Sequence, residues 1–150
     1  FTFVTPGYSV RPLEMSGAIG SVQLKKEQEM RTQRIRNAKY FKHKFNDNTN
    51  VLTQKEIGES SWFGFSIVLQ NELEGKRDDL VKKLIENGVE CRPIVAGNFM
   101  RNPVIDYLEY YNNNCPNADY IHDNGLFIGN DIRDLKENID MVYDIIKELK

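Results

Sequence analysis

The feature that most constrains the fold is a helical pattern that extends from Pro12 to about Phe45. Its apolar residues recur at the spacing of one helix face, and they include Met15, Ala18, Ile19, Val22, Ala38, Phe41 and Phe45. Pro12 suits the first turn of a helix, where its missing N–H has no partner to lose. Because helices average about 11 residues, the pattern predicts a bend or two abutting helices.

The start of this pattern contains glycines that a helix usually avoids. It reads "GYSVRPLEMSGAIGSVQLKK" from Gly7 to Lys26. An interior glycine costs about 1 kcal/mol relative to alanine. We therefore infer that Gly17 and Gly20 let the helix pack closely on a neighbouring element.

The remaining patterns alternate between strands and helices. "NDNTN" at 46–50 predicts a turn, and the run from Ser60 to Leu69 predicts a strand with Trp62 in the core. A helix that ends at Gly88 follows, then a strand from Val89 to about Val95. Short helices, the strand "LFIGN" and an amphipathic helix complete the chain, the last with a capping box formed by Asp134 and Glu137. This order predicts an α/β (α+β) fold, with a long N-terminal helix and a small mixed sheet covered by helices on one face.

Length and charge narrow the classes of function. The 150 residues suit one domain, and the net charge of −2 gives no drive toward nucleic acid or a membrane. Cys91 and Cys115 lie far apart in the sequence, which favours neither a zinc site nor a disulfide framework. No run of residues is long and apolar enough to cross a bilayer. We expect a soluble cytoplasmic protein without nucleic-acid or membrane partners.

A search for a self-contained active site assigns no catalytic residue and no metal ligand. The sequence lacks the G-x-S-x-G, H-E-x-x-H, P-loop and G-x-G-x-x-G motifs. His43 and His122 lie among polar neighbours and are expected at the surface, while Cys91 is expected as a structural thiol rather than a nucleophile. Arg11 precedes a helix and could bind a phosphate or carboxylate, or form a structural ion pair with Glu14. Arg92 leaves the same two alternatives open.

Four stretches of the sequence resemble one enzyme family. "PGYSVRPLEMSGAIGSVQLKK" is similar to the start of the C-terminal domain of the DegT-type sugar-nucleotide aminotransferases and dehydratases. "GESSWFGFS" and "ECRPIVAGNF" are similar to the subgroup that contains the GDP-4-keto-6-deoxymannose 3-dehydratases of colitose biosynthesis. With "NADYIHDNGLFIGN", the resemblance covers essentially the whole chain.

This resemblance implies the small C-terminal domain, residues 1–150, of a longer enzyme with the aspartate aminotransferase fold (PLP fold type I). The large domain would hold most of the pyridoxal or pyridoxamine phosphate, together with the catalytic lysine or histidine. In a homodimer, Ser9 and Arg11 would contact the cofactor phosphate of the partner subunit, although the family usually has asparagine at the position of Ser9. Arg92, Asn98 and Phe99 would lie near the substrate.

The implied reaction removes the C3 hydroxyl from a nucleotide-linked 4-keto-6-deoxy sugar, with glutamate as amino donor. Two alternatives remain open at this point. One is a sugar-nucleotide 4-aminotransferase of the perosamine synthase type, and the other is a stand-alone small-molecule-binding α/β module.

Overall fold

The computed structural model describes residues 2–7, 13–111 and 114–149. Its α-helices are α1 (Glu14–Leu24), α2 (Glu27–Phe45), α3 (Arg77–Glu86), α4 (Pro116–Asn124) and α5 (Lys136–Lys147). Its strands are β1 (Val51–Thr53), β2 (Gly64–Leu69), β3 (Cys91–Arg92) and β4 (Gly125–Gly129). Three short 3-10 helices are also described: η1 (Asn71–Leu73), η2 (Phe99–Arg101) and η3 (Pro103–Tyr107).

The strands form one sheet in the order β1-β2-β4-β3. All three pairings are antiparallel, so the expectation of a mixed sheet is corrected. In the central pair, Phe65 lies opposite Ile128 and Ile67 lies opposite Leu126. Because side chains alternate along a strand, these pairs point to the same face of the sheet.

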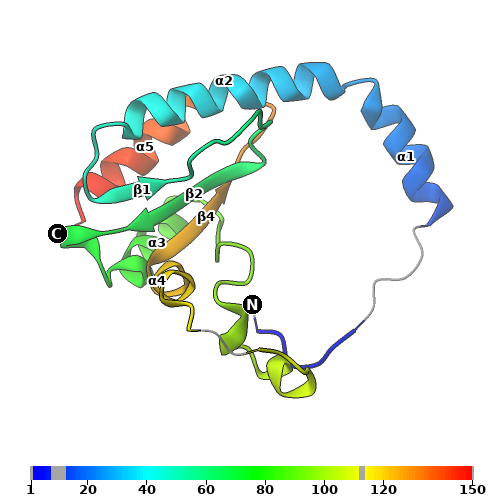
Figure 1. The fold of residues 1–150 in the computed structure, drawn as a ribbon. Coiled ribbons are helices and arrows are strands. Elements are labelled where there is room, and N and C mark those ends of the chain that lie inside the picture. Colours follow the sequence, from blue (N-terminus) through cyan, green and yellow to red (C-terminus); the bar gives the residue numbers. More distant parts are fainter. Residues whose placement is uncertain (1, 8–12, 112–113, 150) are drawn as a thin grey trace.

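Helices α2, α3 and α5 cover that face, as the sequence predicted for one side of the sheet (Figure 1). Phe41 of α2 is fully buried, and its ring stacks on Phe65 with a centroid distance of 4.3 Å. The buried core also contains, from α3, α5 and the strands, Leu80, Leu84, Ile139, Val142, Ile146, Ile67, Leu69, Leu126 and Ile128. Trp62 is buried in this core, as predicted.

The long helical pattern is divided at Lys25 and Lys26, which confirms the prediction of a bend or two helices. Helix α2 buries its apolar face, whereas α1 has no buried residue and projects away from the sheet (Figure 1). A Cβ at Gly17 or Gly20 would meet no other atom within 4 Å. The close packing inferred for these glycines is therefore not made by any element in the described part of the chain.

The start of β2, the length of β3 and the start of α5 differ from the predictions. Strand β2 begins at Gly64 rather than Ser60, because Trp62 has a φ of 53° that interrupts the extended run. Strand β3 is limited to Cys91–Arg92, since Pro93 lacks an N–H for the ladder and Val95 has a φ of 54°. Helix α5 begins at Lys136, whose N–H donates to the Asp134 carboxylate at 3.1 Å, and its N-cap Leu135 makes no side-chain cap bond. The predicted capping box of Asp134 and Glu137 is therefore wrong.

The carboxylate of Glu56 holds the turn that leads into β2. It accepts hydrogen bonds from Trp62 Nε1 and Ser60 N, both at 3.1 Å, and pairs with Lys42 at 3.2 Å. The bond from Trp62, followed by that from Lys42, lowers the pKa of Glu56 from its usual value. A lowered pKa in the folded state stabilises the fold above the unfolded-state pKa of about 4.3, and this contribution is lost as the pH falls through the folded pKa.

We therefore expect Glu56→Gln to destabilise the chain at pH 7 and to equal the wild type near pH 2. Urea unfolding followed by Trp62 fluorescence at both pH values measures this difference. Glu59→Gln, an exposed carboxylate in the same loop, is the control. A deficit of Glu56→Gln that persists unchanged at the lower pH would contradict the assignment to the carboxylate charge.

Candidate functional site

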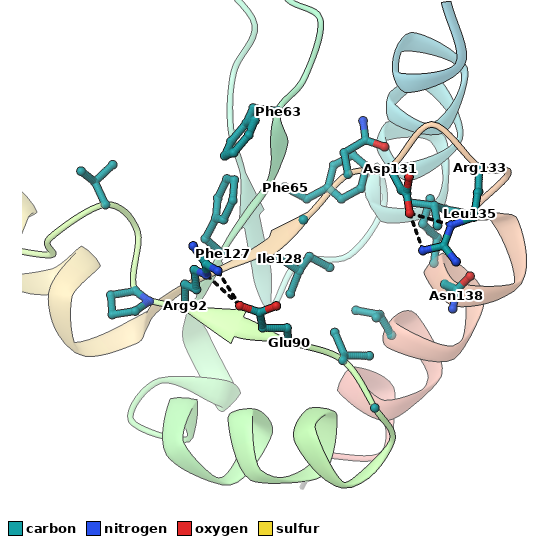
Figure 2. A pocket seen from close by; sticks show the side chains of 18 residues that line it. Phe63, Phe65, Glu90, Arg92, Phe127, Ile128, Asp131, Arg133, Leu135 and Asn138 are labelled. Carbon is teal, nitrogen blue, oxygen red and sulfur yellow. Dashed lines mark hydrogen bonds and ion pairs between the residues drawn. The ribbon is translucent and has the colours of Figure 1, made fainter. Parts of the chain in front are cut away.

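A groove of about 680 Å³ opens beside the short strand β3 (Figure 2). Its apolar floor is formed by core residues of the sheet and α5, among them Phe65, Ile128, Ile139 and Val142. The charged residues that line it are Glu90, Arg92, Asp131 and Arg133. The groove therefore combines an apolar surface with a few placed polar groups, which is typical of small-molecule sites.

Arg92 lies at the end of β3, with its exposed guanidinium at the rim of the groove. Its Nε and Nη2 both donate to Glu90 Oε1, at 2.9 and 2.6 Å. Arg92 thus forms an ion pair and also lines the groove, and its binding of a ligand anion stays a prediction. Because exposed pairs of this kind contribute little to stability, a ligand anion can replace the carboxylate at low cost.

Two aromatic rings form another wall of the groove. Phe63 is 74% exposed, and its ring stacks on Phe127 with a centroid distance of 6.0 Å (Figure 2). The guanidinium carbon of Arg34 lies 5.9 Å from the centre of the Phe63 ring. Planar or apolar parts of a ligand would find stacking surface here.

A buried amide network positions the loop that carries Asp131 and Arg133. Asn37 of α2 is 2% exposed, and its Nδ2 donates to Asn130 Oδ1, Asp131 O and Arg133 O. A hydrogen bond from the Arg133 side chain and one from the Ile132 N–H hold the pKa of Asp131 below its usual value. Sequence reasoning missed this network because asparagine in a helical pattern gives no signal of long-range pairing.

The predicted site residues fall in different surroundings. Ser9 and Arg11 lie outside the described residues. Asn98 is buried, with its Nδ2 donating to Asp119 at 2.8 Å and its Oδ1 accepting from the Met100 N–H at 3.0 Å. Phe99 is partly exposed, and its ring lies 5.7 Å from that of Phe3. Of the predicted site residues that the structure describes, only Arg92 lines the groove.

Cys91 and His122, which the sequence analysis considered as a possible nucleophile and a surface histidine, also have defined surroundings. Burial raises the pKa of the Cys91 thiol to about 11, which keeps it protonated and favours the structural role. His122 is partly buried, and its Nδ1 accepts the Asn98 N–H at 3.0 Å, so the expectation of a surface histidine is corrected.

In the described ranges, no group of three or more His, Cys, Asp or Glu residues is placed to hold a metal ion. Nor is any described helix of the length and apolarity that spanning a membrane requires.

Comparisons with known proteins agree with the resemblance seen in the sequence. The chain is 49% identical over 149 residues to the GDP-4-keto-6-deoxy-D-mannose 3-dehydratase of Escherichia coli O55:H7, a match that covers 98% of this chain and 38% of that protein. A solved GDP-4-keto-6-deoxymannose-3-dehydratase with a trapped PLP–glutamate geminal diamine is 49% identical, with a TM-score of 0.84 over 99% of this chain and 38% of that one. A variant solved with bound GDP-perosamine matches equally well, with a TM-score of 0.84 and 49% identity over 97% of this chain and 38% of its own.

These relatives establish the fold as that of the PLP-dependent aminotransferases and dehydratases, of which the chain spans about 38%. The model of the DegT/DnrJ/EryC1/StrS aminotransferase family matches residues 2–147. The chain therefore belongs to the DegT/DnrJ/EryC1/StrS aminotransferase family.

Proposed function

We propose that this chain is the C-terminal small domain of a GDP-4-keto-6-deoxymannose 3-dehydratase in deoxysugar biosynthesis for O-antigen lipopolysaccharide. The observation that carries the proposal is the 49% identity to such a dehydratase over 98% of the chain. The whole enzyme is a cytoplasmic homodimer in this proposal. Its large domain supplies the catalytic residue and most of the cofactor site.

The described groove offers a nucleotide sugar an aromatic wall and two arginines. Its two arginines are each paired with a carboxylate, so the four charges that line it sum to zero. Binding of the diphosphate of a nucleotide sugar would therefore require an arginine such as Arg92 to exchange its carboxylate partner for a phosphate oxygen. In this proposal the groove side faces the substrate, and the resemblance to the family assigns the cofactor phosphate to Ser9 and Arg11, across the dimer interface.

In this proposal, Arg92 holds the substrate at the rim of the groove, while Asn98 and Phe99 shape the loop beside it. When bound, the pyridoxamine phosphate supplies the electron sink for reaction at the sugar carbons. Over the whole reaction, hydrogen replaces the C3 hydroxyl of the sugar, and glutamate becomes 2-oxoglutarate and ammonia. The protein residues of this chain bind and orient the reactants.

The deciding test gives the full-length enzyme GDP-4-keto-6-deoxymannose and glutamate, and analyses the products by mass spectrometry. We expect a sugar nucleotide that has lost one oxygen, with release of ammonia. A product in which the 4-keto oxygen is replaced by an amine would instead establish the aminotransferase alternative.

In the same assay, Arg11→Ala is expected to lower kcat/KM by about 10- to 100-fold, the range that loss of a charged hydrogen bond predicts. Arg11→Lys should recover only part of this loss, because lysine keeps the charge but not the planar fork. Arg31→Ala, which removes an exposed arginine paired with Glu27, is the control. Equal activity of the Arg11 and Arg31 variants would remove Arg11 from the site.

A further inference from the structure

The residues from Pro93 to Asn102, here called the 93–102 loop, run from Arg92 to a contact with the N-terminal segment 2–7. The loop begins directly after Arg92. It first makes a tight turn in which the Gly97 N–H donates to Ile94 O at 2.9 Å. Arg92 is therefore joined to Asn98 through a hydrogen-bonded turn rather than an extended linker.

His122 of α4 fixes this turn. Its Nδ1 accepts the Asn98 N–H at 3.0 Å, which requires a lone pair on that nitrogen and hence the tautomer protonated at Nε2. Gly97 has a φ of 63°, and a Cβ there would lie 2.4 Å from His122 Nδ1. The imidazole thus lies directly against a backbone position that only glycine fits. The carbonyl of His122 in turn accepts from the Arg77 guanidinium, which ties this end of α4 to α3.

Side-chain contacts with the same helix continue along the loop. Asn98 Nδ2 donates to Asp119, one turn before His122, and Arg101 pairs with Asp123 at 2.7 Å. Arg101 and Asp123 are exposed and Asp119 is partly exposed, whereas the His122 bond holds the backbone N–H of the buried Asn98. A backbone N–H left without a partner costs more than a lost surface pair.

The far end of the loop holds the N-terminal segment 2–7. Asn102 Oδ1 accepts the Phe3 N–H at 3.0 Å, and Phe3 O accepts the Val104 N–H at 2.9 Å. The rings of Phe3 and Phe99 lie 5.7 Å apart. Figure 1 shows the N-terminal segment beside this part of the chain. Segment 2–7 leads within a few residues to Ser9 and Arg11.

We propose that His122 is a positioning residue that sets the 93–102 loop and, through it, aligns Arg92 with the segment leading to Arg11. Its Nδ1 holds the middle of the loop, Arg92 directly precedes one end, and the other end is hydrogen-bonded to segment 2–7. The ligand-binding part of this inference rests on the proposed function; the coupling between loop and segment does not.

The test uses the full-length enzyme with two matched variants. His122→Phe keeps a planar ring without an acceptor, and His122→Asn keeps an acceptor the same number of bonds from Cα as Nδ1. Hydrogen exchange by mass spectrometry should show about tenfold faster exchange in peptides covering 94–104 and 2–7 for His122→Phe, and near wild-type exchange for His122→Asn. Gly97→Ala, which pushes on the same ring, should resemble His122→Phe.

Kinetics then test the consequence for binding. His122→Phe should raise KM for the nucleotide sugar about tenfold and change kcat less than about threefold, with recovery in His122→Asn. A purely structural role would lower the melting temperature of both variants without this split between KM and kcat. Wild-type exchange in His122→Phe, or identical behaviour of the Phe and Asn variants, would overturn the positioning role. If the wild-type enzyme turned over a different substrate, the proposed function would be wrong. The exchange data would still test whether His122 holds the 93–102 loop.

Discussion

Substituting leucine for Asn37 is expected to lower the free energy of unfolding by about 3–4 kcal/mol, because the buried amide satisfies several polar groups at once. Its Nδ2 donates to one side-chain oxygen and two backbone carbonyls of the 130–133 segment. Its Oδ1 accepts from Gln33 Nε2 at 3.0 Å and from the Leu135 N–H at 3.3 Å. Leucine has a similar volume but leaves the buried Asn130 side chain and the partly buried backbone groups without these bonds.

Urea unfolding of the 150-residue chain, followed by the fluorescence of its single tryptophan, measures the loss. Gln28→Leu is the matched control, since it also replaces an amide by leucine on α2 but at an exposed position. We expect the control to stay within about 0.5 kcal/mol of the wild type. If both variants lost the same stability, the network would not hold the loop as described.

Replacing Gly64 with alanine is expected to cost about 3 kcal/mol, because there is no space for a methyl group. A Cβ at this position would lie 2.2 Å from Phe127 Cζ and 2.4 Å from the Ile128 carbonyl oxygen. The ring can move, but the carbonyl belongs to the neighbouring strand, so the β2–β4 pairing itself must shift. The displaced Phe127 ring would also leave its stack with Phe63 in the groove wall.

Gly129 provides an unusually close control. It lies directly opposite Gly64 in the ladder, yet a Cβ there would meet nothing within 4 Å. Gly129→Ala should therefore unfold near the wild-type urea concentration, while Gly64→Ala unfolds much earlier. The double variant Gly64→Ala/Phe127→Ala should lose less free energy of unfolding than the two single variants lose together, because the clash with the ring is removed. Equal effects at both glycines would show that loss of glycine, not crowding, sets the cost.

The sequence by itself determined the family of this chain and the approximate positions of its main helices and of β2, β3 and β4, whereas it did not predict β1. The apolar spacing in α3 and α5 predicted which faces are buried, and Gly88, with a φ of 78°, ends α3 as expected. The division of the long N-terminal pattern was also predictable from its length. These predictions hold because periodicity and caps depend on residues within one or two turns of each other.

The tertiary structure decided where the polar residues bond. Asn98 and His122 are 24 residues apart in sequence, and Asn37 and Arg133 are 96 apart. No local pattern marks such pairs, because an amide or imidazole in a helix looks the same whether it faces water or a distant backbone group. For the same reason, only the fold shows that the apolar face of α1 is exposed while that of α2 is buried. Amphipathic spacing indicates that a helix has an apolar face, whereas tertiary packing decides what covers that face.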